Sequence, residues 1–367
     1  MLYNWELDDW LDFKYDLSSI TPLIYQFMES TGRVSRMVEG FSKRDKIETI
    51  IDMMVNEAMK TSEIEDEHLH EDSVRKSVMK NLGFEVDEKS IRDVRAIGMV
   101  EVMNQVRKDF NKRLTKQTLF NWHQAVMKGK EGEMKVGFWR KSKIPVQIIS
   151  GPEYKRVVHF EAPPSVNVPK EMGRFIKWYN DSRKTMAIPL VRSAMAHLYF
   201  ESIHPFQDGN GRIGRALSEK AISQDMGYPV LLNLSKTIQE NRKQYYDYLK
   251  RAQRTNEITE WMHYFIKTIH LSQMETKHSI EFTLKKTKFF DLWKNQLNDR
   301  QTKVINRIFK EGPKGFKGGM NIRKYMGITK TSRAAAKRDL QDLNRKGILM
   351  MQRGGRSTHY LLQLEQL

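Results

Sequence analysis

The chain contains no cysteine among its 367 residues. This absence excludes disulfide bonds, zinc sites built on thiolates and cysteine nucleophiles. No apolar run approaches the ~20 residues that a membrane-spanning helix needs. The first residues, MLYNWELDDW, are acidic and aromatic, whereas a secretory signal begins with basic and then apolar residues. By elimination we expect a globular, cytoplasmic protein that makes no membrane contact.

Acidic residues are also fewer than basic ones. The chain has 63 Lys and Arg and 45 Asp and Glu, which gives a net charge of +18. The sequence pI is about 9.7 and the mean hydropathy is −0.64. Such an excess of positive charge favours polyanionic partners: nucleic acids, nucleotides or acidic protein surfaces. Hydrophobic residues make up 39% of the chain, enough for packed cores, and the length suggests two or three domains.

Helical periodicity dominates the chain, and internal repeats and low-complexity tracts are absent from the sequence. Apolar residues at helical spacing predict helices over these ranges: Ile20–Ser30, Lys46–Lys60, residues 96–130, Pro169–Asn180, Pro189–Ile203, Thr237–Gln253 and Ile258–Lys285. Residues 137–164 are different, since they are rich in β-branched residues and turn formers. There we predict two short strands, Val146–Ile149 and Arg156–Phe160, joined by Ser150-Gly151-Pro152.

The C-terminal part has its own pattern. Helical spacing predicts helices at Arg300–Lys310, Asn321–Met326 and Ser332–Lys346, and two apolar runs around Gly354-Gly355 predict a hairpin. Three helices followed by a hairpin are typical of a winged helix. We therefore predict a mainly α protein in three parts: an N-terminal helical region (1–95), a helical bundle with a small β-hairpin (96–285) and a winged-helix domain (290–367).

One stretch, HPFQDGNGRIGR, runs from His204 to Arg215 and directly follows a largely apolar predicted helix. Gly209-Asn210-Gly211 opens a second helical run, and glycines there let backbone N–H groups converge on an anion at the helix N-terminus. Arg212 and Arg215 have i, i+3 spacing, so they share one helix face and suit a polyphosphate.

Asp208 and His204 add chemistry to this anion site. A carboxylate next to bound phosphates requires a cation between them, and Mg²⁺ commonly binds one or two carboxylates together with phosphate oxygens. His204 is the residue of the loop that can accept a proton near neutral pH. The stretch therefore predicts phosphoryl or nucleotidyl transfer.

Two other interpretations of this stretch remain open. The glycines can form an ordinary turn whose arginines are solvated. Alternatively, His197, Glu201 and His204, spaced i, i+4 and i+7, can bind a metal ion from one helix face. The metal interpretation leaves the glycines and arginines without a role.

The stretch resembles the signature of the Fic family, HxFx(D/E)GNGRxxR. It matches at every fixed position: His204, Phe206, Asp208, Gly209, Asn210, Gly211, Arg212 and Arg215. The similarity extends over roughly residues 50–270 and includes VQIISG, AMAHLYFESI, YPVLLNLS and NRKQYYDYL. Fic proteins mostly transfer AMP from ATP to a hydroxyl of a target protein, and many bacterial ones carry a C-terminal winged helix.

The resemblance implies a role for each residue of the stretch. His204 would deprotonate a Ser, Thr or Tyr hydroxyl of the target, and Phe206 would anchor the loop in the core. Asp208 would hold Mg²⁺ against the α- and β-phosphates of ATP.

The resemblance also assigns the phosphate contacts. The backbone from Gly209 to Gly211 would cradle the phosphates, helped by the Asn210 side chain. Arg212 would hold the β-phosphate and Arg215 the γ-phosphate.

Further residues are implied outside the signature. The hairpin residues Val146, Gln147 and Ile148 would form a flap that aligns the target as an extended strand. Tyr245 and Gln253 fall where members of the family contact the adenine. A buried bundle aromatic is an equally good interpretation of Tyr245.

Many Fic proteins also carry an inhibitory motif, (S/T)xxxE(G/N), whose glutamate pairs with the second arginine. TSEIED here supplies Thr61 and Glu65, while Asp66 stands where the motif has Gly or Asn. Glu65 bound to Arg215 would occupy the γ-phosphate position. The alternative is an acid-rich solvated helix. In related proteins the same glutamate can support removal of AMP, so the reverse reaction remains open.

The C-terminal part is strongly basic. Between Met320 and Arg356 ten Lys or Arg and two Asp give a net charge of +8. This charge favours contacts with a DNA backbone, and protein docking is the alternative. The residues expected to contact DNA are Ser332, Arg333, Lys337, Arg353 and Arg356.

The leading functional hypothesis is a protein adenylyltransferase that uses ATP and Mg²⁺ and is inhibited by Glu65. The second is a DNA-binding regulator whose Fic core senses nucleotide or modifies itself. A third is removal of AMP, or transfer of UMP, phosphate or phosphocholine, because the loop contacts phosphates and not the base. Related proteins often form homodimers, so a homodimer is a further expectation.

Overall fold

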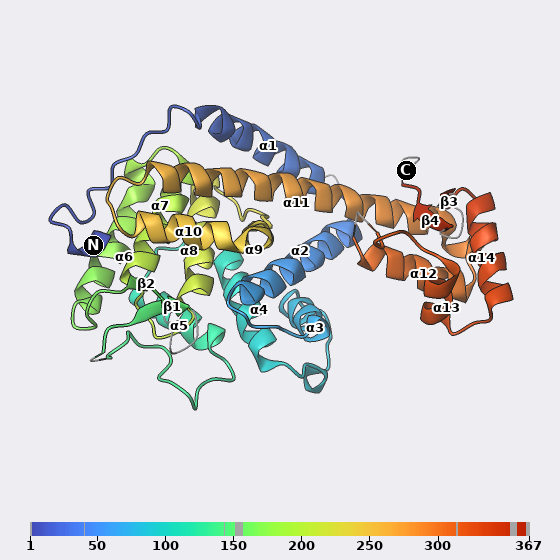
Figure 1. The fold of residues 1–367 in the computed structure, drawn as a ribbon, viewed down its shortest axis with the longest axis horizontal. Coiled ribbons are helices and arrows are strands. Elements are labelled where there is room, and N and C mark those ends of the chain that lie inside the picture. The colour runs from blue at the N-terminus through green and yellow to red at the C-terminus, as the bar shows by residue number, and fades with distance from the viewer. Residues whose placement is uncertain are drawn as a thin grey trace. The chain divides into compact units, whose positions relative to one another are not determined.

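The computed structural model describes residues 2–39, 41–142, 144–150, 157–312, 315–352 and 358–364 (Figure 1). The helices are α1 (Thr21–Glu39), α2 (Lys43–Ile64), α3 (Glu71–Asn81), α4 (Val94–Lys108), α5 (Lys116–Val126), α6 (Val168–Thr185), α7 (Pro189–Ile203), α8 (Asn210–Met226), α9 (Leu234–Glu240), α10 (Arg242–Ala252), α11 (Thr259–Trp293), α12 (Asp299–Lys310), α13 (Ile322–Thr329) and α14 (Arg333–Arg345). The strands are β1 (Gln147–Ser150), β2 (Val157–Glu161), β3 (Leu349–Gln352) and β4 (His359–Leu362). The fold is therefore mainly α, as predicted.

The strands of the described residues form two separate antiparallel hairpins. β1 pairs with β2 in a register that joins Gln147 to Glu161 and shifts between Ile148 and Ile149. β3 pairs with β4, with Leu349 opposite Leu362. The predicted turn residues Gly151, Pro152, Gly354 and Gly355, and the predicted strand residue Arg156, lie outside the described residues.

The chain divides into two compact units. The first comprises Met1–Gly40 and Ile50–Thr276, and the second comprises Phe41–Thr49 and Lys277–Leu367. Each unit contains its own cluster of buried hydrophobic residues. The three-part division expected from the sequence stays a prediction.

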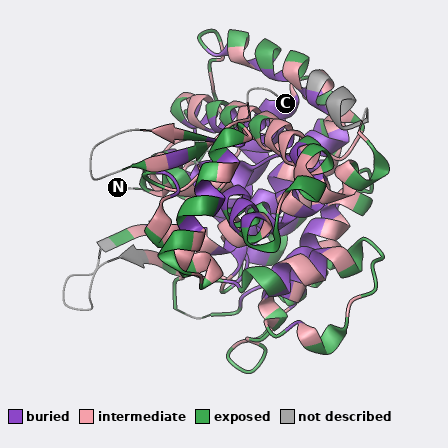
Figure 2. Ribbon diagram, turned by 90° about the vertical axis from the view of Figure 1, so that its right-hand side faces the viewer, coloured by how far each residue is buried: buried purple, intermediate pink, exposed green. Residues whose placement is uncertain are grey.

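Helix α7 is the centre of the first unit. Every one of its residues is buried, including the polar ones. A helix that is apolar on all sides requires neighbours all round, and α7 packs along α8 and α6. Leu198 of α7 and Trp261 and Phe265 of α11 belong to the same core cluster. Figure 2 shows the ribbon coloured by burial, with buried residues in purple on inner helices and exposed residues in green on outer faces and loops. The end of α7 is thus held rigidly.

A buried charge joins α7 to the helices beside it. The Arg192 guanidinium donates hydrogen bonds to the carbonyl oxygens of Tyr179 and Ala221 at 3.0 and 3.1 Å and to Gln224 Oε1 at 2.6 Å. It also pairs with Asp225 at 2.8 Å. Because a buried guanidinium is tolerated only when it is paired and hydrogen-bonded, this set ties α6, α7 and α8 in one arrangement.

The N-terminal segment packs against the end of α7. The Asn4 side chain donates to Ser202 Oγ at 2.9 Å, and its backbone N–H donates to the Gln253 carbonyl at 2.9 Å. Trp5 Nε1 donates to the Glu161 carbonyl at the end of β2 at 2.8 Å. The first residues therefore support both the hairpin and the helix that precedes HPFQDGNGRIGR.

Two helix predictions were wrong. The predicted helical range 96–130 is divided into α4 and α5, with residues 109–115 between them. The predicted helix Thr237–Gln253 is divided into α9 and α10, and Asn241 between them has φ −130° and ψ 38°. Its N–H donates to the Ile238 carbonyl at 3.0 Å, a tightened turn. Asparagine is a weak helix former because its side chain competes for backbone hydrogen bonds, which explains why the apolar spacing alone missed the break.

In the second unit, α12, α13 and α14 and the β3–β4 hairpin surround one hydrophobic cluster. Ser332 begins α14, since its hydroxyl accepts the Ala335 N–H. Tyr325 Oη donates to Asp339 at 2.9 Å, and Arg300 Nε donates to the same carboxylate at 2.8 Å. These bonds join the three helices of the unit. In the part of the chain that the structure describes, no helix is both long and apolar enough to cross a membrane.

Candidate active site

The site begins where α7 ends. His204 has φ 49° and ψ 60°, a left-handed backbone that is uncommon for any residue with a Cβ. Arg140, itself buried, holds this conformation: its Nε donates to the His204 carbonyl at 2.7 Å and its backbone N–H donates to the Pro205 carbonyl at 2.9 Å. Such strained residues concentrate at functional sites. Nothing in the sequence indicated that Arg140 belongs to the site, because this residue lies far upstream of His204 in the chain.

A buried carboxylate faces the imidazole of His204. Glu201 Oε2 lies 3.6 Å from His204 Nδ1, and Glu201 is 3% exposed. Burial raises the pKa of Glu201, but His204, His197 and Arg215 together more than offset this, so the pKa lies below its usual value. An ionised Glu201 beside Nδ1 favours a proton on that nitrogen, which leaves Nε2 to accept one.

The loop between α7 and α8 is closed by one side chain. Asn210 Oδ1 accepts the Phe206 N–H at 2.9 Å, and Asn210 Nδ2 donates to the Phe206 carbonyl at 2.9 Å. Phe206 is fully buried and stacks on His123 with ring centroids 4.1 Å apart. The Asn210 side chain was expected to help cradle phosphates; its amide is instead engaged in shaping the loop.

Backbone at the start of α8 comes close to an acidic side chain. Gly209 precedes the helix with φ 82°, a conformation that favours glycine. A Cβ on Gly211 would lie 2.1 Å from Glu65 Oε1. Glycine at this position therefore leaves room for an anionic group against the helix N-terminus.

Arg215 is enclosed by the end of α2. It is 3% exposed, and its Nε donates to Thr61 Oγ1 at 2.8 Å. Its Nη2 donates to the Thr61 carbonyl at 2.7 Å and pairs with Glu65 Oε1 at 2.9 Å. Thr61 lies in the last turn of α2, whereas Glu65 lies in the turn that follows. The structure thus brings together the two residues of the expected inhibitory motif and the second arginine.

Asp66, the departure from that motif, has a structural explanation. Its φ is 58°, and Gly, Asn and Asp are the residues that best tolerate this left-handed conformation. Its carboxylate also pairs with the Arg242 guanidinium, at 2.6 and 2.7 Å. Asp66 therefore satisfies the backbone requirement of the Gly/Asn position.

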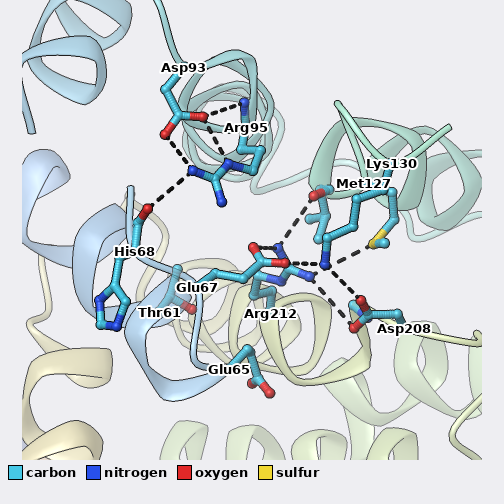
Figure 3. Close-up of polar contacts among 12 residues, drawn as sticks. Thr61, Glu65, Glu67, His68, Asp93, Arg95, Met127, Lys130, Asp208 and Arg212 are labelled. Carbon is cyan, nitrogen blue, oxygen red and sulfur yellow. Dashed lines mark hydrogen bonds and ion pairs between the residues drawn. The ribbon is translucent and has the colours of Figure 1, made fainter. Parts of the chain in front are cut away.

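The first arginine is engaged by a carboxylate that the sequence analysis did not identify. Arg212, 3% exposed, donates to Glu67 Oε2 at 2.6 Å. Glu67 also accepts a hydrogen bond from Lys130 Nζ, which lies 3.2 Å from Asp208 Oδ2 (Figure 3). Asp208 in turn lies 3.7 Å from Arg212 Nη2. In the sequence, Glu67 could have been identified by its place in the acidic run after Glu65. No sequence feature pointed to Lys130.

Asp208 fits a metal ion that is shared with phosphates. Its side chain is 40% exposed, and its Oδ1 accepts the Gly209 N–H at 2.5 Å. Among the described residues, no three His, Cys, Asp or Glu side chains gather closely enough to hold a metal ion by themselves. A single carboxylate next to an anion site matches the one or two carboxylates that Mg²⁺ uses when phosphates supply its other ligands.

Three residues expected to contact ligands are buried instead. Tyr245 and Gln253 are 1% and 2% exposed, and Tyr245 Oη lies 2.7 Å from His197 Nε2. Burial lowers the pKa of His197 to about 4, and its ring stacks on Trp261 and Phe265. His197 is thus a hydrogen-bonded core histidine and not part of a metal site. An adenine contact for Tyr245 or Gln253 stays a prediction that this packing does not favour.

The predicted flap lies at the β1–β2 hairpin. The Val146 carbonyl accepts the Ala162 N–H at 2.9 Å, and the exposed Gln147 side chain donates to Glu161 at 2.7 Å. Ile148 opposes Phe160 in the ladder. Because the sheet has only two strands in the described part of the chain, each strand has an edge to which an extended peptide can add.

Comparison with known families matches two segments of the chain. The Fic/DOC family model matches residues 113–221, which include the whole stretch from His204 to Arg215. A domain of unknown function, DUF4172, matches residues 3–84, which include Thr61 and Glu65.

Curated relatives match over short segments. The chain is 38% identical to a protein adenylyltransferase Fic of Culex quinquefasciatus over 81 residues, 22% of this chain and 15% of that protein. It is 34% identical to one of Drosophila grimshawi over 111 residues, 29% of this chain and 22% of that protein. The chain thus covers under a quarter of the length of these relatives.

Two solved structures share the fold. A Fic family protein from Desulfovibrio desulfuricans G20 has a TM-score of 0.53 at 20% identity, covering 94% of this chain and 97% of that one. A Fic domain containing signaling protein from Bacteroides thetaiotaomicron VPI-5482 has a TM-score of 0.54 at 19% identity, covering 71% and 98%.

Proposed function

The chain is a Fic family protein, and from this premise we propose that it transfers AMP from ATP to a hydroxyl side chain of a target protein, inhibited by Glu65. One observation carries the proposal. Both arginines of the signature are almost fully buried, and each is paired with a carboxylate from the turn after α2. Buried guanidinium groups that converge beside a helix N-terminus suit a polyphosphate, and carboxylates fill that place here.

The residues of this chain account for the proton and the leaving group. The target hydroxyl oxygen attacks the α-phosphorus of ATP, and its proton passes to His204 Nε2. The bond from the α-phosphorus to the bridging oxygen breaks, and pyrophosphate leaves with that electron pair. Glu201 Oε2 lies 3.6 Å from the other ring nitrogen, Nδ1.

The phosphates are held by groups that precede and begin α8. Backbone N–H groups from Asn210 onward would face the phosphates, and Arg212 and Arg215 would bind the β- and γ-phosphates. Mg²⁺ bound at Asp208 would neutralise charge on the phosphate oxygens. In the described conformation Glu65 occupies Arg215, so the γ-phosphate has to displace it; this is the basis of the proposed inhibition.

The test is intact-mass spectrometry after incubation with ATP and Mg²⁺. The unaltered protein, Glu65→Gly and Glu65→Gly/His204→Ala are compared. We expect only Glu65→Gly to gain the mass of AMP, since a general base contributes about 10²- to 10⁴-fold. Equal labelling of the unaltered protein would refute inhibition by Glu65. If no variant gains mass and none labels a protein in a lysate supplied with labelled ATP, the transferase proposal fails.

The same assay separates the related reactions. An adduct with the mass of phosphate, or of UMP when UTP is supplied, indicates a different transferred group. Loss of AMP from a previously labelled protein that depends on Glu65 indicates the reverse reaction.

A second function is favoured by the surface of the second unit. Exposed cations lie on or next to α13 and α14: Arg323, Lys330, Arg333, Lys337 and Arg338. We propose that this unit is a winged helix that binds the DNA backbone through α14. Ser332 caps α14 with its hydroxyl, while Arg353 and Arg356 lie outside the described residues.

DNA binding is tested on the full chain by titrating duplex DNA at several salt concentrations. Each phosphate contact contributes a slope of about −0.9 to the plot of log affinity against log salt. Lys337→Ala is expected to weaken binding and reduce that slope by about 1. Lys346→Ala is the matched control, because its ammonium is engaged by Asp342 at 2.6 Å and the Gln296 carbonyl at 2.7 Å. If the affinity for DNA does not depend on salt, the proposal of DNA-backbone binding fails, and protein docking remains as the function of this unit.

A further inference from the structure

Glu67 is held by two cations at once. Its carboxylate accepts hydrogen bonds from Arg212 Nη1 at 2.6 Å and from Lys130 Nζ. Figure 3 shows the Glu67 carboxylate between these two side chains, with Lys130 continuing to Asp208. Lys130 follows α5 and Arg212 lies in the first turn of α8, so the two cations come from different parts of the first unit.

This arrangement differs from an ordinary surface ion pair. The side chains of Arg212 and Glu67 are 3% and 11% exposed, and that of Lys130 is 26% exposed. Two like charges in a largely desolvated place repel each other unless an anion lies between them. The position of the Glu67 carboxylate is therefore an anion site with two cationic ligands.

The backbone around Glu67 is held by hydrogen bonds. The Glu67 N–H donates to the Ser62 carbonyl at 3.0 Å. On the next residue, Arg95 donates to the His68 carbonyl at 3.2 Å while also paired with Asp93 (Figure 3). These bonds hold the backbone on both sides of the Glu67 carboxylate, so the proposed exchange of Glu67 for a phosphate involves its side chain.

We propose that Lys130 and Arg212 form one subsite for the β-phosphate of the nucleotide, and that Glu67 is its internal occupant. This inference rests on the proposed function, and it makes Lys130 a substrate-binding residue. Glu67 becomes a second inhibitory carboxylate, which blocks the first arginine while Glu65 blocks the second.

Asp208 connects the subsite to the expected magnesium position. Lys130 Nζ lies 3.2 Å from Asp208 Oδ2, so one ammonium bridges Glu67 and the carboxylate that would hold the metal. When a phosphate replaces Glu67, Lys130 keeps an anionic partner next to the carboxylate that would hold the metal. Lys130 therefore links the proposed phosphate subsite to the proposed metal position.

The test measures binding of ATP, ADP and AMP by isothermal titration calorimetry with Mg²⁺, in a His204→Ala background that prevents turnover. Because ADP has a β-phosphate and AMP lacks one, the series reports which subsite each residue affects. We expect Glu67→Gln to tighten ATP and ADP on the order of 10-fold, the loss of one charge-assisted competitor, and to leave AMP unchanged. Glu65→Gln is expected to tighten ATP more than ADP.

Lys130 is tested in the Glu67→Gln background, where the subsite is open. Lys130→Met is expected to weaken ATP and ADP by a similar factor, and Lys130→Arg to retain most of the affinity. Thermal unfolding of each variant verifies that it folds.

Specific results would overturn the inference. If Glu67→Gln leaves ADP affinity unchanged, or changes AMP affinity equally, Glu67 and Lys130 form a structural pair only. If Lys130→Met binds ADP as tightly as its parent, Lys130 is no phosphate ligand. The nucleotide series can hold while no AMP adduct forms, in which case the transfer proposal fails and the subsite stands. If no variant binds any nucleotide, both fail.

Discussion

Glu57 on α2 provides a pH-dependent test of the packing around the inhibitory turn. It is buried, and its two carboxylate oxygens each lie 3.0 Å from the Ser235 nitrogen at the start of α9. Burial raises the pKa of Glu57 from 4.5 to about 7, and the Ser235 hydrogen bonds offset only part of this effect. Burial likewise raises the pKa of Glu219 to about 8, with a further contribution from the charge of Glu57.

The direction in which stability changes with pH follows from the coupling of proton binding to folding. An acid whose pKa is raised by folding holds its proton more tightly in the folded state, so stability is full below the unfolded pKa. It falls as pH rises from 4.5 to about 7 and then stays low. The difference of about 2.5 pKa units corresponds to about 3 kcal/mol. Glu57→Gln replaces the carboxylate by a neutral group that can still accept the Ser235 N–H.

We therefore expect Glu57→Gln to match the unaltered protein in free energy of unfolding near pH 5 and to exceed it by up to about 3 kcal/mol near pH 8. Urea denaturation followed by tryptophan fluorescence measures this, because Trp122 and Trp261 are buried in the same unit. Glu63→Gln is the control, since it removes a carboxylate of the same helix that reaches solvent and pairs with Lys60. Equal stabilities of the unaltered protein and Glu57→Gln at both pH values would refute the reasoning.

Three further substitutions test the geometry around the site. Gly214→Ala is expected to cost about 1–3 kcal/mol in urea denaturation, because its Cβ would lie 2.6 Å from Glu201 Oε1; an unchanged midpoint would contradict that contact. Asp66→Ala should lower the thermal midpoint by more than Asp66→Gly does, since a left-handed backbone costs about 1–2 kcal/mol for a residue with a Cβ; the reverse order would remove the backbone argument. Arg192→Met is expected to destabilise by about 3–5 kcal/mol in chemical denaturation, because it leaves the buried Asp225 carboxylate unpaired; a loss under ~1 kcal/mol would show that solvent reaches Asp225.

Local features were predictable from the sequence because they depend on neighbours in the chain. The range Pro189–Ile203 of α7 was predicted to the residue, since its apolar run lies between a proline and the left-handed His204. The anion-binding character of the start of α8 followed from glycines and arginines at short spacing.

Long-range contacts could not be predicted in this way. The partner of Arg212 is Glu67, which lies 145 residues upstream, and Lys130 lies 63 residues beyond Glu67. Their proximity depends on how α2, α5 and α8 pack, and no periodicity encodes it. Similarly, the adenine role expected for Tyr245 ignored the buried histidine with which its hydroxyl bonds.

The pairing of Glu65 with Arg215 has a consequence for the equilibrium between closed and open sites. The Glu65 carboxylate, on the residue directly after α2, is a ligand at a fixed effective concentration, which neither dilution nor dialysis changes. Whether Glu65 occupies Arg215 is set by an intramolecular equilibrium. The fraction of molecules with an open site is therefore the same in a dilute as in a concentrated protein solution. A rise in nucleotide concentration competes with this equilibrium by mass action, whereas a partner that draws away the turn at Asp66 changes the equilibrium itself. The fraction of open sites is therefore determined by the turn after α2, which lies outside the twelve residues of the signature.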